Sequence, residues 1–219
     1  RPIRAFVDRV AASIVGLGFT VQVIDQSALT SAADWFSRVE ETHDYVLYVA
    51  EKEDAAWAQL CARQVDRLFL VGNALALPSG EPPGLPSDDE AHRPTDLILL
   101  RDPGVAPDNA AVWIAALAPA RWFHLREGDP SDEARLARVI AGCSVGLVLS
   151  GGGARAYAHL GAVRTLRQAG VPFDFVGGSS MGAVVAAGLA LEWDQEELET
   201  RIRQAFVESS PLSDIAFPI

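Results

Sequence analysis

The chain has 219 residues, of which 49% are hydrophobic and 21% are charged, a composition typical of a soluble globular protein with one large or two modest domains. It carries 18 basic and 29 acidic residues, a formal net charge of −11, and its single lysine is Lys52. Because no basic stripe can neutralise phosphates, we expect no nucleic-acid partner. Cys61 and Cys143 lie far apart without a CxxC pair or a histidine cluster, which predicts two buried free thiols and no metal site.

Strand-like and helix-like segments alternate along the first 72 residues. Apolar periodicity predicts helices over 3–17, 32–41 and 55–62, with Thr30 or Ser31 as the cap of the second helix. Runs rich in β-branched and aromatic residues predict strands over 19–24, 45–50 and 67–71. Uninterrupted apolar strands that alternate with helices indicate a mostly parallel sheet.

The alternation continues after a proline-rich segment. Residues 78–94 hold five prolines together with glycine and acidic residues, which predicts a surface loop. Further strands are expected over 96–100 and 121–125, with helices over 110–117 and from Asp129 and Pro130 onward. The sequence therefore predicts an α/β fold with helices on both faces of the sheet, divided near Gly142 into a Rossmann-like region, 1–142, and a second region, 143–219.

Two glycine-rich turns carry the chemistry of the second region. Residues 150–156 read Ser-Gly-Gly-Gly-Ala-Arg-Ala, between an expected strand over 146–149 and an expected helix over 154–169. Backbone N–H groups at a helix start favour negative charge, so this turn suits a developing oxyanion. Residues 178–182 read Gly-Ser-Ser-Met-Gly, between an expected strand over 173–176 and an expected helix over 183–187. This GxSxG pattern is typical of a nucleophile elbow with Ser180 as nucleophile, flanked by Gly178 and Gly182 because larger residues would clash.

The first turn also fits a second chemistry. Gly151, Gly153 and Ala156 satisfy the dinucleotide-binding pattern GxGxx(G/A), which requires an acidic residue at the end of the following strand. That strand ends in glycines and serines instead, which disfavours a nucleotide-binding protein but leaves it open as an alternative. A Walker loop is excluded, because Lys52 lies far from both turns in the sequence.

Three polar residues near the second turn are expected to be structural. Asp174 precedes Ser180 by six residues, at the wrong end of the incoming strand to act as its acid partner. His159 also precedes Ser180, whereas a hydrolase triad places its histidine after the serine, so a packed or surface histidine is expected. The side chain of Ser179 is expected to point in a different direction from that of Ser180 on the turn.

Taken together, the two turns resemble the patatin-like phospholipase family, whose members carry a GGGx(R/K)G loop after the first strand and a GxSxG elbow after the second. The resemblance implies that Ser180 is the nucleophile of a carboxylic ester hydrolase. It also implies that backbone amides form the oxyanion hole, those of Gly151, Gly152, Gly153 and Arg155. The region from Cys143 onward would then be the first part of a three-layer α/β/α domain.

Residues 131–219 look like the bacterial branch related to neuropathy target esterase, and residues 1–130 resemble more loosely the α/β region that precedes the patatin domain there. This resemblance implies a phospholipid or lysophospholipid substrate, a cytoplasmic location with peripheral membrane contact, and no cofactor. It further implies a cyclic-nucleotide-binding domain upstream in a longer parent protein.

Two positions depart from the family pattern. The final glycine of the loop is Ala156 here, whose Cβ is expected to tighten the turn. Family members also use an aspartate in an Asp-Gly-(Gly/Ala) turn well after the serine, and this chain contains no Asp-Gly pair. Because a serine without a base is a weak nucleophile, we expect the aspartate beyond Ile219 and an inactive segment in isolation. The alternative is a non-catalytic member that binds lipid or a partner.

Overall fold

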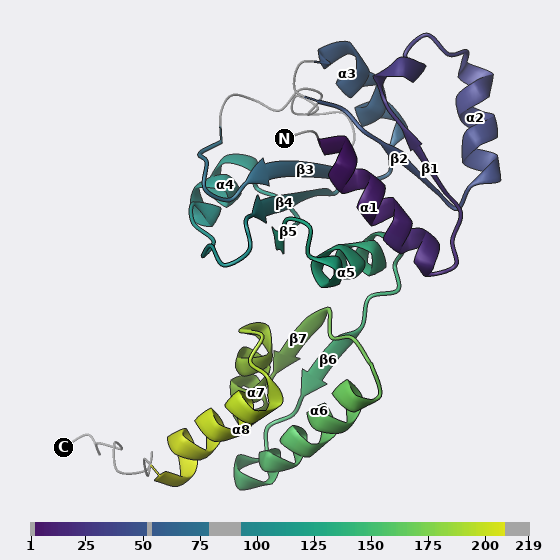
Figure 1. The fold of residues 1–219 in the computed structure, drawn as a ribbon. Helices are drawn as coiled ribbons and strands as arrows, with labels where there is room; N and C mark the ends of the chain where they lie inside the picture. The colour runs from purple at the N-terminus through teal and green to yellow at the C-terminus, as the bar shows by residue number, and fades with distance from the viewer. Residues whose placement is uncertain (1–2, 52–53, 79–92, 209–219) are drawn as a thin grey trace. The chain divides into compact units, whose positions relative to one another are not determined.

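The computed structural model describes residues 3–51, 54–78 and 93–208, so most of the predicted proline-rich loop lies outside the described residues. The chain divides into two compact units, residues 1–142 and 143–219 (Figure 1). Each unit is an arrangement of helices around parallel strands, which confirms the α/β class. Among the described residues, no helix combines the length and the apolar character that crossing a bilayer requires.

The first unit follows the predicted alternation, with element ends shifted by at most two residues. Its helices are α1 (Ile3–Gly16), α2 (Ala33–Thr42), α3 (Ala55–Gln64), α4 (Ala110–Leu117) and α5 (Pro130–Ile140), with a short 3₁₀ helix η1 (Gln26–Ala28). Its strands are β1 (Val21–Ile24), β2 (Tyr45–Tyr48), β3 (Leu68–Asn73), β4 (Thr95–Arg101) and β5 (Arg121–Arg126).

The helix starts show one wrong prediction. Ala32 is the N-cap residue of α2 and makes no side-chain capping bond, so neither Thr30 nor Ser31 has the predicted role. Asp129 does cap α5, because its carboxylate accepts hydrogen bonds from the backbone N–H groups of Ser131 and Asp132.

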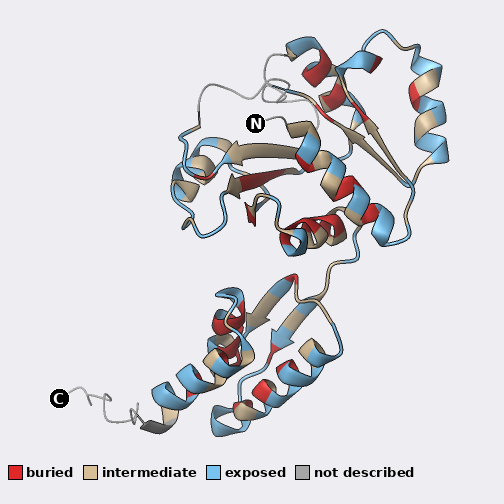
Figure 2. Cartoon of the chain, viewed as in Figure 1, coloured by how far each residue is buried: buried red, intermediate tan, exposed pale blue. Residues whose placement is uncertain are grey.

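Parallel strands form the centre of this unit. β1 pairs with β2, and β3, β4 and β5 pair in that order; Ile98 in β4 lies opposite Val71 and Phe123. Helices α1 and α5 pack together in one core cluster, which includes Ile98. Leu97 and Leu99, whose side chains point to the other face, pack with α4 instead. Helices therefore cover both faces, and β4 is the most buried strand (Figure 2).

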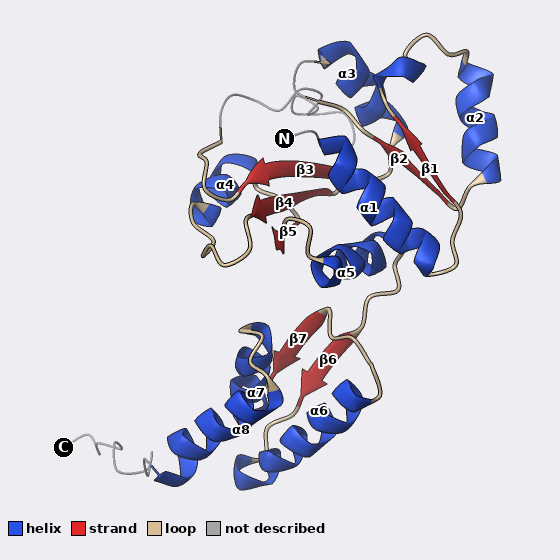
Figure 3. Ribbon diagram, in the orientation of Figure 1, coloured by secondary structure: helices blue, strands red, loops and turns tan. Residues whose placement is uncertain are grey.

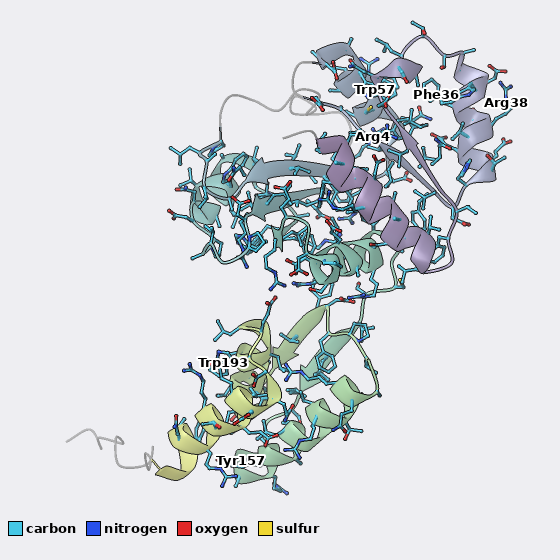
Figure 4. All side chains as sticks on the ribbon, in the orientation of Figure 1. Arg4, Phe36, Arg38, Trp57, Tyr157 and Trp193 are labelled. Carbon is cyan, nitrogen blue, oxygen red and sulfur yellow. The ribbon has the colours of Figure 1, made fainter. Side chains whose placement is uncertain are left out.

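A second cluster packs α2 and α3 against β1 and β2. Phe36 and Trp57 come from the two helices with ring centroids 6.4 Å apart (Figure 4), and Trp57 Nε1 donates to the Val49 carbonyl at 2.7 Å. Cys61 is buried in this cluster, and burial raises the pKa of its thiol to about 12. The prediction of two buried thiols is wrong for Cys143, which is exposed in the segment between α5 and β6 rather than packed within an element.

A fully buried carboxylate ties three strands together. Asp96, the second residue of β4, accepts from Arg67 Nη1 at 2.9 Å and from Arg121 Nη2 at 2.6 Å. Arg67 directly precedes β3 and Arg121 begins β5, so one side chain joins the starts of neighbouring strands. We expect Asp96→Asn to lower the free energy of unfolding by about 3 kcal/mol, because it leaves two arginines without their counter-charge.

Urea denaturation of the chain measures this loss. Asp34→Asn is the matched control, since Asp34 pairs with Arg38 on the exposed surface of α2 and such pairs contribute about 0.5 kcal/mol or less. Equal effects of the two substitutions would show that the Asp96 cluster has no special role in stability.

The second unit is smaller, with β6 (Gly146–Leu149) and β7 (Phe175–Gly178) in parallel (Figure 3). Its helices are α6 (Ala158–Gln168), α7 (Met181–Ala190) and α8 (Gln195–Arg203), with a 3₁₀ helix η2 (Gly153–Tyr157) and a final π-helical turn η3 (Gln204–Glu208). Apolar residues of α6, α7 and α8 form one cluster with Leu147, Leu149 and Val176. The opposite face of the strands is open in the described residues, where Val148 is 82% exposed.

Two details differ from expectation in this unit. The strand before the GxSxG turn, β7, lies two residues later than 173–176, and Asp174 directly before it accepts a hydrogen bond from the Val145 N–H at 2.9 Å. The helix expected to start at residue 154 begins as the 3₁₀ turn η2 and becomes α-helical at Ala158. A tighter 3₁₀ turn, η2, therefore lies between the glycine loop and α6.

Candidate active site

The parallel pairing of β6 and β7 brings the two glycine-rich turns together. Leu149 and Gly178 are the last residues of the strands and lie opposite each other, so both turns leave the same edge of the sheet. The Ser179 N–H donates to the Leu149 carbonyl at 3.0 Å, which continues the pairing into the turns. A Cβ built on Gly151 would lie 3.1 Å from Ser180 Cβ. The two motifs, some 30 residues apart in sequence, therefore form one site.

Ser180 has the strained backbone that an elbow imposes. Its φ is 51° and its ψ is −126°, a combination that is costly for a residue with a side chain and that clusters at functional sites. The flanking glycines allow this turn. A Cβ on Gly178 would lie 2.5 Å from the carbonyl carbon of Gly182, and a Cβ on Gly182 would lie 2.5 Å from the Ser150 carbonyl oxygen.

The Ser180 side chain is exposed at the start of α7. It makes no capping hydrogen bond to that helix, and no described side chain hydrogen-bonds to its hydroxyl. The positive end of the α7 dipole lies at this residue and favours negative charge there. The arrangement thus presents a hydroxyl oxygen to solvent beside an electropositive helix start.

Several backbone N–H groups of the two turns have no acceptor among the described residues, namely those of Gly151, Gly152, Gly153 and Met181. The Met181 N–H is at the first position of α7, where backbone donors have no intrahelical partner. The Arg155 N–H differs, because it donates to the Gly152 carbonyl at 3.2 Å. In this arrangement the 3₁₀ turn η2 uses the Arg155 donor.

His159 contacts the glycine loop from α6. Its Nε2 donates to the Ser150 carbonyl at 2.8 Å, which places the ring proton on Nε2. The Ser150 carbonyl and the Gly151 N–H belong to one planar trans peptide and point in opposite directions. The histidine therefore fixes the direction in which the Gly151 N–H points.

Asp174 lies at the opposite end of β7 from Ser180 and is buried, with its carboxylate bound to the Val145 N–H. The expected structural role of Asp174 is confirmed. Ser179 is exposed beside Ser180, and its carbonyl accepts from the Gly182 N–H at 2.9 Å, which closes the turn.

Sequence reasoning missed two contributors to this site. The Met181 amide follows the nucleophile position directly, and the position of a hydrolase oxyanion donor after the serine could have indicated it. For His159 the sequence predicts a packed or surface position and no contact with the glycine loop. Its place one turn into the helix after the glycine loop was the available signal for a contact with that loop.

Comparison with known proteins assigns the two units to two families. The model of the patatin-like phospholipase family matches residues 147–214. The model of the neuropathy target esterase family P-loop like domain matches residues 7–126, more than half of the chain. No solved structure shows a significant match.

Similar proteins carry both regions. Patatin-like phospholipase domain-containing protein 7 of Rattus norvegicus is 30% identical over 85% of this chain, and protein 6 of Homo sapiens is 29% identical over 84%. A neuropathy target esterase (NTE) family protein of Mycobacterium tuberculosis is 33% identical over 97% of the chain. The chain spans 16% of the length of the two mammalian proteins and 36% of the mycobacterial one. The chain therefore belongs to the neuropathy target esterase family of patatin-like phospholipases.

Proposed function

We propose that the parent protein is a serine esterase that hydrolyses acyl esters of phospholipids or lysophospholipids. The observation that carries the proposal is the strained Ser180 on a turn that meets the glycine loop at Gly151, with four backbone N–H groups of the two turns left without acceptors among the described residues. Ser180 Oγ attacks the ester carbonyl, and the amides of Gly151, Gly152, Gly153 and Met181 receive the oxyanion. Each such donor contributes about 10²-fold to 10³-fold to kcat.

The reaction then proceeds in two steps. Collapse of the tetrahedral intermediate breaks the ester C–O bond, releases the alcohol and leaves the acyl group on Ser180 Oγ. Water attacks this acyl-enzyme, and the fatty acid leaves while the proton returns to the serine. The base that takes up the serine proton is an aspartate from the parent sequence after Ile219, because no described side chain hydrogen-bonds to the hydroxyl.

The family supports a lipid as substrate, and the remaining assignments follow from the resemblance. We place the protein in the cytoplasm with peripheral membrane contact and a cyclic-nucleotide-binding domain upstream. Residues 1–142 form a domain of their own ahead of the catalytic domain that starts at Cys143. Residues 1–219 alone are expected to be inactive.

The test is fatty-acid release by the full-length protein from lysophosphatidylcholine and from phosphatidylcholine in mixed micelles. Catalysed release by the full-length protein and none by residues 1–219 is the expected result. Binding of phosphatidylcholine vesicles without any release would assign the protein to the non-catalytic alternative.

The contact of His159 with the glycine loop predicts that kcat depends on the N–H donor of this side chain. His159→Leu removes the donor to the Ser150 carbonyl, so the Gly151 N–H loses its fixed direction, and kcat is expected to fall about tenfold with little change in KM. His159→Gln keeps an N–H donor at a similar reach and is expected to restore most of the loss. Steady-state kinetics of the full-length variants measure both values. Equal kcat for the leucine and glutamine variants would contradict a positioning role.

A further inference from the structure

A groove separates the two groups of strands in the first unit. Among the described residues, no backbone hydrogen bond joins β2 to β3, so the inner edge of each strand is open. The space between them has a volume of about 940 Å³. Its walls are mainly apolar and come from both strands and from the helices over both faces, as in Val10, Leu47, Cys61, Phe69 and Leu136.

The two strands that border the groove have sequences typical of central strands. β2 reads Tyr-Val-Leu-Tyr and β3 begins Leu-Phe-Leu-Val, which is apolar on both faces, as parallel strands in the middle of a sheet require. Yet every residue of β2 is only partly buried, and so are the first five of β3, whereas β4 has four fully buried residues in a row (Figure 2). All four residues of β2 and the first four of β3 line the groove.

The position of the first residues of α1 shows at which edge of the sheet the chain enters this helix. Arg4 Nη1, in the side chain labelled in Figure 4, donates to the Asp25 carboxylate at 2.6 Å. Asp25 directly follows the carboxyl end of β1. Helix α1 therefore begins at the carboxyl edge of the sheet, and Ile3 lines the groove. A parallel strand in the groove would end at this same edge, directly ahead of α1.

The faces on which the helices lie agree with such a strand. Crossovers between parallel strands are right-handed, so helices that connect strands in opposite directions along the sheet lie on opposite faces. The connection from a strand in the groove through α1 to β1 would run toward one edge of the sheet. The connections through α2, α3 and α4 would run toward the opposite edge. Helix α1 does pack on the α5 face, and α2, α3 and α4 pack on the opposite face.

We infer that the groove receives an extended segment of the parent chain that lies upstream of residue 1 and leads into α1. The segment lies parallel to β2 and β3, pairs with both, and completes one six-stranded sheet with itself in the third position. A strand buried on both faces requires apolar, β-branched residues without proline. Since this chain spans 16% to 36% of the length of its relatives, such proteins have sequence available for the segment.

Hydrogen exchange tests the inference on two forms of the protein. One is the chain 1–219, and the other carries in addition about ten residues of its own upstream sequence, enough for one strand. The control form has the same extension with prolines at two alternate positions, which cannot donate to a sheet ladder. Mass spectrometry follows the amides of residues 45–48 and 68–73, and light scattering reports the oligomeric state of each form.

The natural extension is expected to slow exchange in β2 and β3 at least about tenfold, to leave β5 and the second unit unchanged, and to keep the protein monomeric. The proline extension is expected to exchange like the chain 1–219. Unchanged exchange with the natural extension would overturn the inference. So would protection of β2 and β3 that appears only with dimer formation, because the groove would then bind a second copy.

Discussion

Replacing Ser180 with alanine in the full-length protein is expected to lower kcat for lysophospholipid hydrolysis by about 10⁴-fold or more, because the acyl-enzyme cannot form without the hydroxyl. The fold should tolerate the change. The hydroxyl is exposed and makes no hydrogen bond to a described residue, so its loss leaves no partner unsatisfied. Fatty-acid release and the urea midpoint, measured on the same preparation, separate chemistry from stability.

Ser179→Ala is the matched control, because Ser179 is the neighbouring exposed serine on the same turn. Its structural contribution is made by backbone atoms, which bond to Leu149 and Gly182 and which alanine retains. We expect this variant to keep kcat within about threefold of the unmodified protein. Loss of activity in Ser179→Ala with retention in Ser180→Ala would move the nucleophile to the other serine.

Gly178→Ala is expected to destabilise the second unit by about 3 kcal/mol and to reduce activity with it. The added Cβ would lie 2.5 Å from both the carbonyl carbon and oxygen of Gly182 and 2.6 Å from the Ala183 nitrogen. All three are backbone atoms at the start of α7, so relief requires that the helix move away from β7. That movement also displaces Ser180, which lies between the strand and the helix.

Gly177→Ala provides the comparison within the same strand. A Cβ at Gly177 meets no atom within 4 Å, and its side chain points to the open face of β7. Replacing a strand glycine with alanine there is expected to be neutral or to stabilise by about 0.5 kcal/mol, through the unfolded state. Urea denaturation of both variants gives the difference, and equal midpoints would mean that α7 does not pack as closely on β7 as described.

The order of strands and helices could be predicted from the sequence, because apolar runs in 1–142 are separated by breaks such as Gly18 and the proline-rich segment 78–94. The approach of the two turns could also be predicted, since parallel strands joined by one helix end at the same edge. The cap of α2 could not, because Thr30 and Ser31 have suitable side chains but the helix begins two residues later. The presence of a suitable capping side chain does not by itself determine the residue at which a helix begins.

Which backbone amides of the site are engaged, and what His159 contacts, depends on backbone geometry that cannot be read from the residue types. The Arg155 amide is engaged because the chain after Gly152 winds first as a 3₁₀ turn, and the Met181 amide lacks an acceptor because α7 begins there. The His159 contact is made by a side chain that reaches back to a carbonyl nine residues earlier in the chain. The groove in the first unit likewise depends on which strands pair, and strand pairing is not visible in the pattern of a single strand.

The most direct test of the nucleophile is covalent capture. The full-length protein is treated with an alkyl fluorophosphonate, which reacts with activated serines, and the modified peptide is located by tandem mass spectrometry. We expect one adduct on Ser180, none on Ser179, and loss of hydrolysis in proportion to labelling. An adduct on a different serine, or full loss of hydrolysis with Ser180 unmodified, would contradict this expectation.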